Sequence, residues 1–351
     1  MASAASQLLG MTLDGGWKVI SPSTSLKHGT GGNFSVGYIV QNEDGREAFL
    51  KALDYSSALR APDPARALEA LTKAFNFERD VLSKCRGLDR VVTALADGSV
   101  HVSGAAEGVV QYLIFELAAG DVRAKATISK SFDLAWALRS THHVATGIRQ
   151  LHSREIAHQD LKPSNVLVFP DNVSKVSDLG RAAYKGHIPP HDVFTYAGDP
   201  TYAPPELRYG YTDPDWNKRR LGCDAYLLGS MVVFFFTGVG MTSLIEAELQ
   251  PGHSWRVWGG TYQEVLPYVR TAFTNVVIKF ENEIISQYDN SVLRDDLSEV
   301  VKQLCEPDPN LRGDPKNILI QANQFSLERY LSKFDYLARR AEMGLFKKVG
   351  H

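Results

Sequence analysis

The stretch HQDLKPSNVL, residues 158–167, places a carboxylate, an ammonium and an amide within six positions of one another. These groups belong to Asp160, Lys162 and Asn165, and Pro163 between them is unfavourable in the interior of a regular helix. We therefore expect a loop that presents three polar groups from a short length of chain. A carboxylate can accept a proton, an ammonium can balance negative charge, and an amide oxygen suits a hard cation such as Mg²⁺.

The composition of the whole chain is that of a globular protein. Its 351 residues allow two lobes or domains at about 150 residues each. The hydrophobic share of 44% and the charged share of 22% argue against disorder, and the net charge of −2 predicts no nucleic-acid or acidic-membrane partner. Cys85, Cys223 and Cys305 form no C-x-x-C pair, which predicts reduced thiols in a cytoplasmic protein without a zinc or disulfide framework.

Two stretches of the sequence bear on membrane association. The N-terminal MASAASQLLGMTLDGG lacks the basic region and the long apolar core of a signal peptide. The stretch AYLLGSMVVFFFTGVGM, residues 225–241, falls just short of the ~18 uninterrupted apolar residues that mark a membrane span. We interpret it as a helix buried within a lobe, and we expect no membrane insertion.

The pattern of elements changes along the chain. Residues 35–53 predict a hairpin around the turn NEDG, and Asp63 followed by Pro64 predicts the start of a helix. Two more strands are expected near residues 90–102 and 109–117. From about residue 130 the periodicity becomes helical, interrupted by short strands in NVLVF and SKVSD. The last segment, residues 326–351, predicts an amphipathic helix, and residues 242–300 match no motif.

Other motifs stand in a fixed order around the opening stretch. They are the glycine-rich GTGGNFSV, then AFLKAL with Lys51, and, after the opening stretch, SDLGRA with Asp178 and GDPTYAPPEL with Glu206. The ordered set resembles the protein-kinase superfamily, specifically its Ser/Thr branch, over roughly residues 17–325. Four positions depart from the family's pattern: Phe34 replaces the third glycine, Gln159 an arginine, Leu179 a phenylalanine and Pro204 an alanine.

The resemblance implies a fold and an activity. The fold is α+β and bilobal, with a small antiparallel-sheet N-lobe at residues 1–117 and a mainly helical C-lobe at residues 118–325. ATP and Mg²⁺ are then expected between the lobes. The expected reaction transfers the γ-phosphoryl group to a Ser or Thr hydroxyl of a protein substrate, and Lys162 favours this branch because the family's tyrosine branch usually lacks that lysine.

The resemblance also implies roles for the polar residues. Asp160 would accept the proton of the acceptor hydroxyl, and Lys162 would reach the transferred phosphate. Asn165 and Asp178 would be the metal ligands.

Lys51 would hold the α- and β-phosphates and needs a glutamate to orient it. Glu78 lies on the apolar stripe with Leu71, Phe75 and Leu82, where a carboxylate requires a partner. Glu69 is the alternative, but Lys73 four residues later predicts a solvated pair there.

The nucleotide site is expected at the glycine loop and at the stretch YLIFELAAGD. Gly29 and Gly31 would let the backbone approach the phosphates closely, and Val36 completes the motif. Phe115 would lie at the back of the adenine pocket, while the backbone of Glu116 and Ala118 would bond the adenine edge. Asp121 has two interpretations that remain open, a ribose contact or a helix cap.

Two residues far along the chain complete the resemblance. Asp224 matches the aspartate that anchors the catalytic loop, and Arg312 matches the arginine that pairs with Glu206.

Two other classes of function remain as alternatives. A pseudokinase, acting as a nucleotide- or partner-binding module, is suggested by the replacements at Phe34, Gln159 and Leu179. A small-molecule phosphotransferase of related fold is disfavoured by Lys162 and by the PPEL stretch. Gln159 also predicts that phosphorylation of the segment between Asp178 and Glu206 is not needed for activity, because an amide cannot pair with a phosphate as an arginine does. Acceptors in that segment are Tyr184, Thr195, Tyr196, Thr201 and Tyr202.

Overall fold

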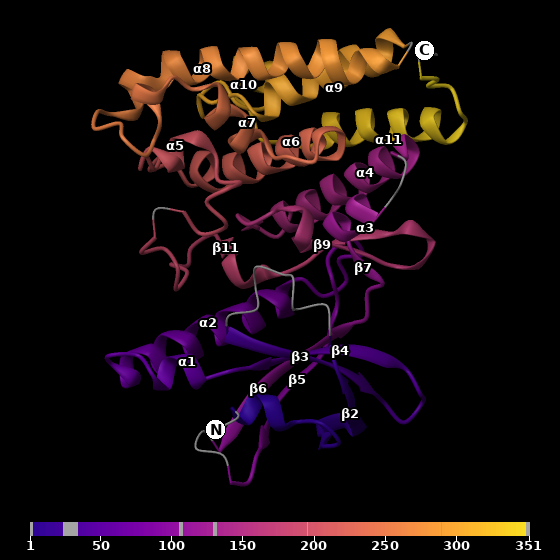
Figure 1. Ribbon diagram of the computed structural model, residues 1–351, viewed down its shortest axis with the longest axis vertical. Coiled ribbons are helices and arrows are strands. Elements are labelled where there is room, and N and C mark those ends of the chain that lie inside the picture. Colours follow the sequence, from indigo (N-terminus) through magenta and orange to yellow (C-terminus); the bar gives the residue numbers. More distant parts are fainter. Residues whose placement is uncertain are drawn as a thin grey trace.

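The structure is a computed structural model that describes residues 3–23, 34–104, 108–128, 132–194, 196–288 and 290–348. A smaller lobe built on a sheet and a larger, mainly helical lobe are stacked along the long axis of the molecule (Figure 1). This is the bilobal α+β architecture that the sequence predicted. Gly29, Gly31 and Thr195 lie outside the described residues.

One antiparallel sheet organises the described part of the smaller lobe. Its strand order is β1-β2-β3-β4-β6-β5. One face of the sheet packs into an apolar core that includes Tyr38, Leu50, Tyr112 and Ile114. The strands are β1 (Thr12–Leu13), β2 (Trp17–Pro22), β3 (Ser35–Gln41), β4 (Glu47–Leu53), β5 (Ala94–His101) and β6 (Val109–Glu116).

The hairpin of β3 and β4 confirms the prediction for residues 35–53 and fixes which side chains face the larger lobe. Gly37 lies opposite Lys51, and Val36 lies opposite Ala52. Successive residues of a strand point to opposite faces of the sheet. Gly37 and Lys51 therefore share one face, while Val36 lies on the other with the core.

Helix α2 (Pro64–Lys84) follows the short α1 (Ser56–Leu59) and begins where the sequence predicted. The Asp63 carboxylate accepts the N–H of Arg66 at 3.1 Å, which satisfies one of the free amides of the first turn. The helix buries Phe75, Glu78, Val81 and Leu82. Glu78 is thus a carboxylate on an otherwise apolar face.

The larger lobe contains most of the helices and two small sheets. The sheets pair β7 (Gly120–Asp121), β9 (Val166–Val168) and β10 (Ser174–Val176), and β8 (Ile156–Ala157) with β11 (Ala183–Tyr184). Three short turns hold site residues: η5 (Pro163–Asn165), η7 (Leu179–Arg181) and the π-helical η8 (Asn217–Leu221). The helices are α3 (Val122–Ile128), α4 (Leu134–His152), α5 (Pro205–Arg208), α6 (Gly222–Thr237), α7 (Met241–Glu248), α8 (Tyr262–Lys279), α9 (Ser291–Leu304), α10 (Pro315–Leu319) and α11 (Glu328–Glu342).

Helix α6 is the buried helix expected from the apolar stretch at residues 225–241. In the described chain, only the helix Asn217–Thr237 is long and apolar enough to cross a bilayer by length and composition. However, 89% of its apolar window is buried inside the fold. Packing against neighbouring helices accounts for its apolar character on all sides.

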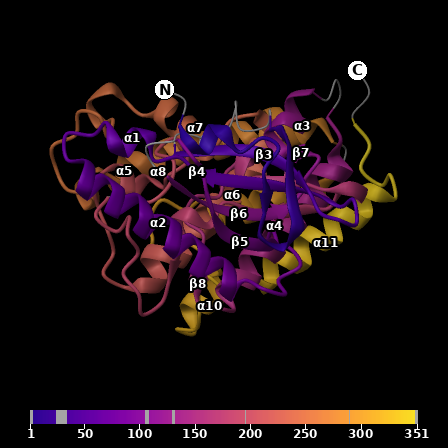
Figure 2. The same ribbon diagram turned by 90° about the horizontal axis from the view of Figure 1, so that it is seen from below.

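Helix α11 is the amphipathic helix expected near the C-terminus. It packs against α4, and Arg139 of α4 bonds Asp335 at 2.9 Å and Glu342 at 2.7 Å. In projection from below, α2 lies to one side of the strands of the smaller lobe, and α11, in the larger lobe behind them, lies to the other (Figure 2). The division of the chain at residues 117 and 325 stays a prediction.

Candidate active site

A buried carboxylate holds the loop at residues 158–165. Asp224, in the first turn of α6, is fully buried. Its two oxygens accept the backbone N–H groups of His158 at 2.8 Å and of Gln159 at 2.7 Å. Gln159 has a φ of 62°, a left-handed conformation that non-glycine residues adopt infrequently. The predicted anchoring of this loop by Asp224 is confirmed.

Both carboxylate oxygens of Asp160 have partners. Oδ1 accepts a hydrogen bond from the N–H of Asp199 at 2.7 Å, and Oδ2 accepts one from Nδ2 of Asn165 at 3.1 Å. Nζ of Lys162 lies 3.2 Å from Oδ2. All three side chains from the loop are buried or nearly so. The structure therefore brings together the acid, the base and the amide that the sequence singled out.

Asp199 is a site residue that the sequence analysis did not identify. Its Oδ2 accepts from Nζ of Lys162 at 3.5 Å, so this ammonium lies between two carboxylates. Gly198 makes the approach possible, since a Cβ there would lie 2.5 Å from Oδ1 of Asp160. The only sequence signal was a Gly-Asp pair, which is common in turns.

Lys51 is oriented by Glu78, as predicted. Its Nζ donates to Oε1 and Oε2 of Glu78 at 2.8 and 2.9 Å. The same ammonium lies 3.8 Å from Oδ1 of Asp178. Glu69, the alternative partner, is exposed and pairs instead with Lys73 at 2.6 Å. The open choice between the two glutamates is thus resolved in favour of Glu78.

Burial and neighbouring charges shift the pKa values in this cluster in opposite directions. Burial alone would lower the pKa of Lys51, but Glu78 and Asp178 outweigh it and raise this pKa to about 12. Burial likewise opposes ionisation of Asp178, yet nearby cations, Lys51 first, bring its pKa below the ordinary value. Lys51 is therefore a cation and Asp178 an anion at neutral pH.

A cavity of about 190 Å³ lies between the lobes and receives side chains from both. Glu78 and Lys51 border it from the smaller lobe, while Asn165 and Asp178 border it from the larger lobe. Its apolar lining consists of Phe49, Leu82, Val91, Val92, Phe115, Leu117, Leu167, Val176 and Leu179. A flat apolar ring with a polar edge suits such a space.

Val36 does not line this cavity. The register of the hairpin directs its side chain to the opposite face of the sheet, where it packs against the core of the smaller lobe. The sequence prediction for Val36 as a nucleotide-binding side chain is therefore wrong. Ser35 and Phe49 border the cavity instead. Phe49 could have been found from the sequence, because it lies two residues before Lys51 on the same strand and shares its face.

The segment that joins the lobes borders the same cavity with Phe115, Glu116 and Ala118. The Glu116 carboxylate is fixed by Lys175 at 2.7 Å and by the N–H of Thr93 at 2.8 Å, so it is not free to enter the cavity. The N–H of Ala118 has no hydrogen-bond partner among the described residues. That amide is a free donor at the cavity wall.

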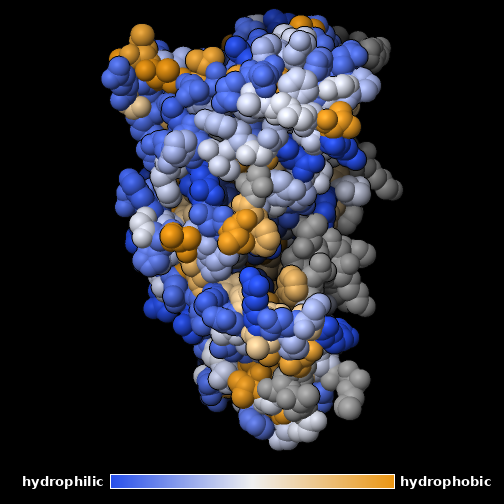
Figure 3. Space-filling view, turned by 90° about the vertical axis from the view of Figure 1, so that its left-hand side faces the viewer, coloured by the Kyte–Doolittle hydropathy of each residue, from blue (hydrophilic) through white to orange (hydrophobic). Residues whose placement is uncertain are grey.

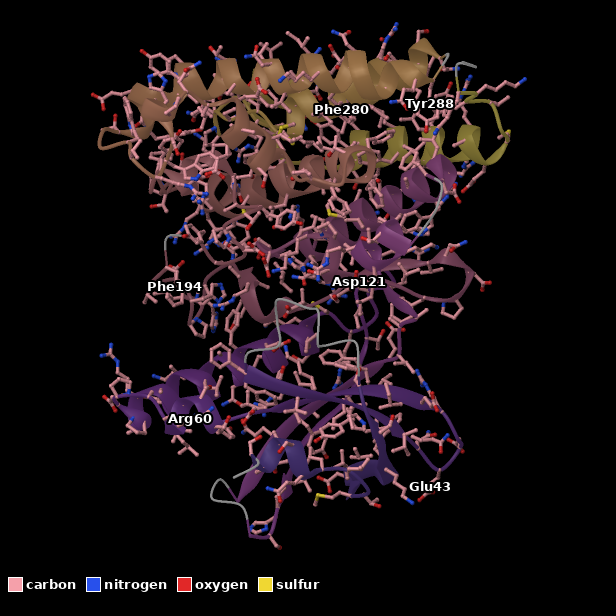
Figure 4. The ribbon with its side chains drawn as sticks, in the orientation of Figure 1. Glu43, Arg60, Asp121, Phe194, Phe280 and Tyr288 are labelled. Carbon is pink, nitrogen blue, oxygen red and sulfur yellow. The ribbon has the colours of Figure 1, made fainter. Side chains whose placement is uncertain are left out.

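Asp121 meets both of the interpretations left open by the sequence. Its Oδ1 accepts the N–H of Ala124 at 2.7 Å, which caps the first turn of α3. It also borders the cavity, at the level where the lobes join (Figure 4). The cap is formed in the structure, and the ribose contact remains a prediction.

The predicted pair of Glu206 and Arg312 is confirmed. Two guanidinium nitrogens of Arg312 donate to the two carboxylate oxygens of Glu206, each at 2.7 Å. Arg312 is fully buried, and its guanidinium lies 5.1 Å from the ring centre of Tyr226. This bidentate pair fixes α5 to the base of the larger lobe.

The oxygens beside the cavity fit the expected Mg²⁺. Nδ2 of Asn165 is occupied by Asp160, which leaves Oδ1 of Asn165 without a hydrogen-bond partner among the described residues. Asp178 faces the same cavity, in a left-handed conformation with φ of 59°. No cluster of three His, Cys, Asp or Glu side chains forms a metal site in the described part of the chain. Mg²⁺ needs few protein ligands when phosphate oxygens and water supply the others.

Comparison with known sequences supports the resemblance to the protein-kinase superfamily. Residues 25–322 match the sequence model described as the protein kinase domain. Over 73 residues the chain is 42% identical to serine/threonine-protein kinase PTK1/STK1 of Saccharomyces cerevisiae, covering 19% of this chain and 11% of that protein.

Other relatives align over longer stretches at lower identity. Aurora/IPL1-related protein kinase 2 of Caenorhabditis elegans is 27% identical over 128 residues, or 36% of this chain and 39% of that protein. The hormonally up-regulated neu tumor-associated kinase of Mus musculus is 26% identical over 228 residues, or 63% of this chain and 27% of that protein. The alignments thus span well under two thirds of each of these relatives.

Proposed function

Since the chain belongs to the protein kinase family, we propose that it transfers the γ-phosphoryl group of ATP to a Ser or Thr hydroxyl of a protein substrate. The observation that carries this proposal is two neighbouring groups of side chains that meet at Asn165. Lys51, Glu78, Asp178 and Asn165 border the cavity between the lobes. Asp160 and Lys162 lie beside it, where Nδ2 of Asn165 donates to Asp160 and Lys162 contacts the same carboxylate.

The Lys51 ammonium would hold the α- and β-phosphates. Its contact with Glu78 directs it into the cavity, and its raised pKa keeps it charged. The free N–H of Ala118 and the carbonyl of Glu116 would bind the adenine edge, with Phe115 and the apolar lining around the ring. Orientation of the phosphates before reaction lowers the barrier because the entropy of alignment is lost on binding.

Asp160 would accept the proton of the acceptor hydroxyl. The N–H of Asp199 and the Asn165 amide fix the position of its carboxylate, so that reorientation is not needed during the reaction. Lys162 would place positive charge beside the phosphoryl group as it moves. Asn165 and Asp178 would hold Mg²⁺, which neutralises phosphate charge when bound.

Incubation with labelled ATP, Mg²⁺ and a mixture of generic protein substrates tests the proposal. We expect label on Ser and Thr, identified by partial hydrolysis of the products. Asp160→Asn should lower the rate by on the order of 10²–10⁴, the usual contribution of a positioned base, without loss of Mg-ATP binding. Asp171→Asn is the matched control, because Asp171 is exposed and its φ of 59° suits asparagine.

Other outcomes would point to a different function or to a different role for Asp160. Mg-ATP binding without transfer by the unaltered protein would identify a pseudokinase, the alternative suggested by Gln159 and Leu179. Transfer only to small molecules would identify a small-molecule phosphotransferase. An Asp160→Asn variant as fast as the unaltered protein would refute the role given to Asp160.

A further inference from the structure

Asp192 lies in the activation segment, which we define as residues 178–206, and bonds two arginines outside it. Nη2 of Arg219 donates to Oδ1 of Asp192 at 2.8 Å, and Nη2 of Arg220 donates to the same oxygen. Both arginines belong to η8, the turn that leads into α6. One carboxylate thus joins the middle of the activation segment to η8.

Arg220 also contacts the catalytic loop. Its Nη1 donates to Oε1 of Gln159, the residue directly before Asp160. Nε2 of Gln159 in turn donates to the carbonyl of Arg181 at 3.1 Å, at the start of the activation segment. Asp192, Arg220 and Gln159 therefore form a continuous polar connection between the activation segment and the catalytic loop.

Charge explains why the carboxylate matters in this connection. Arg220 is buried, with 6% of its surface exposed, and Gln159 supplies only a neutral oxygen. A buried guanidinium requires an anion, and removal of that anion leaves an unpaired buried charge. Among the described residues, Asp192 is the carboxylate paired with Arg220. An anion is therefore already present where the activation segment meets the catalytic loop.

Three apolar side chains next to Asp192 add little anchoring because they are exposed to solvent. Ile188, Val193 and Phe194 are 86%, 83% and 58% exposed. Phe194 lies on the outer side of the segment (Figure 4), and apolar side chains gather at the surface on this side of the molecule, where the lobes meet (Figure 3). The polar connection through Asp192 and the buried ring of His191 therefore hold this part of the chain.

His191 extends the same anchor to the smaller lobe. Its buried ring packs edge-on against Phe77 of α2, with the ring centres 6.0 Å apart. Phe77 directly precedes Glu78, the partner of Lys51. Burial, followed by the charges of Arg181 and Arg220, lowers the pKa of His191 to about 4, so His191 adds no charge to the cluster. His191 therefore contacts α2 through its ring, whereas the charged contacts of Asp192 lead to the catalytic loop.

We propose that Asp192 is a positioning residue whose carboxylate is a built-in anion that assembles the active site without modification of the activation segment. The inference rests on the proposed kinase function. Asp192 acts through Arg220 and Gln159 on the loop that carries Asp160. Gln159 fits this arrangement because its amide oxygen accepts from Arg220, whereas an arginine there would place a second cation against the first.

Three variants of Asp192 test the proposal against Asp171→Asn as the control. Asp192→Asn and Asp192→Ala should lower kcat by at least tenfold and leave the KM for ATP within about twofold, because Asp192 does not border the nucleotide cavity. Asp192→Glu keeps the charge and should restore most of kcat. Limited proteolysis should cut the activation segment faster in the Asn and Ala variants, at equal thermal stability of the remaining fold.

A comparison of the two arginines refines the test. Arg220→Ala should cost more kcat than Arg219→Ala, because only Arg220 also contacts Gln159. Phosphatase-treated protein, shown by mass spectrometry to be unmodified in residues 178–206, should start at its full rate without a lag.

Specific outcomes would overturn the proposal. Unaltered kcat and unaltered proteolysis in Asp192→Asn would do so, as would a phosphatase-treated protein that regains its rate only after modification of the segment. A loss of kcat that Asp192→Glu does not restore would show that shape, and not charge, is what counts. If the unaltered protein transfers no phosphate at all, the proposed function fails, but the proteolysis comparison still decides whether Asp192 holds the segment.

Discussion

At the scale of single residues, the site depends on charges that are buried in contact with one another. Asp160 has partners on both oxygens, and Lys162 lies between Asp160 and Asp199. In such a site the ionisation of one group depends on its neighbours. The pH dependence of the rate should therefore change when a neighbouring charge is removed.

The first prediction concerns the acid side of the pH profile. Burial raises the pKa of Asp160 above its ordinary value, and Lys162 opposes the rise. The base works only when deprotonated, so kcat/KM should fall as the pH drops through this raised pKa. Lys162→Gln removes the opposing cation and should move the acid limb to higher pH. A profile measured on peptide substrate checks this, and a limb that stays in place or moves to lower pH would contradict it.

The second prediction concerns Lys51 and Glu78 as one unit. Lys51→Met and Glu78→Gln each break the same contact at 2.8 Å, so the double variant should lose little more activity than either single variant. Glu69→Gln is the control and should be close to the unaltered protein, since Glu69 is exposed. Rates for the unaltered protein and the four variants test the idea, and losses that multiply would show that the two residues act separately.

At the scale of elements, local sequence signals predicted where helix α2 begins, whereas the register of the strands was not predicted. The long-range pair of Glu206 and Arg312 was predicted from the family resemblance. The start of α2 was predicted because Asp63 and Pro64 form a cap with their immediate neighbours. Strand β2 was not predicted, because its register with β3 depends on residues far along the chain. The role predicted for Val36 was wrong for the same reason, since a sequence motif does not determine how the strands pair. The bonds of Asp192 to η8 join segments that only the fold brings together.

The third prediction concerns the packing of α4 against the strands. A Cβ at Gly147 would lie 2.6 Å from the carbonyl oxygen of Arg90 and 2.9 Å from Cγ2 of Val176. Alanine improves helix propensity by about 1 kcal/mol, but overpacking costs typically 1–3 kcal/mol. Because the clash is with backbone, Gly147→Ala should lower the free energy of unfolding. Urea unfolding measures this, and the exposed Arg149→Ala should change it by only about 0.5 kcal/mol. If Gly147→Ala instead raised the free energy of unfolding, the backbone at Arg90 and strand β10 would have to shift freely.

At the scale of the whole molecule, there are two apolar cores, and the cavity is lined by residues of the larger one, among them Leu82, Val91 and Leu179. One core lies within the sheet of the smaller lobe, and the other runs through the larger lobe and includes Phe75, Val81 and Leu82 of α2. Helix α2 thus belongs to the larger core although its chain lies in the first third of the sequence. A ligand in the cavity would contact both lobes at once.

The fourth prediction follows from that arrangement. A ligand that binds only the folded protein stabilises it by about 2.7 kcal/mol at a hundredfold excess over Kd. Mg-ADP should therefore raise the melting temperature of the unaltered protein and of Asp171→Asn. Asp178→Ala should lose the part of the increase that requires Mg²⁺, as judged against a titration in EDTA. An equal increase in the Asp178→Ala variant would exclude Asp178 as a ligand of the metal.

Helix α6 also affects the order in which the protein can be made. It is covered partly by α9, which ends at Leu304, and by Phe325, whose ring lies 3.0 Å from a Cβ built at Gly222. A ribosome adds about 5–20 residues per second, so α6 leaves the exit tunnel several seconds before α9 and Phe325 follow it. During that interval an apolar segment long enough for a bilayer is exposed to water, to chaperones and to other nascent chains. A chain stopped before Leu304 should therefore remain bound to chaperones or aggregate, whereas a chain that extends beyond Phe325 should bury α6 and be released.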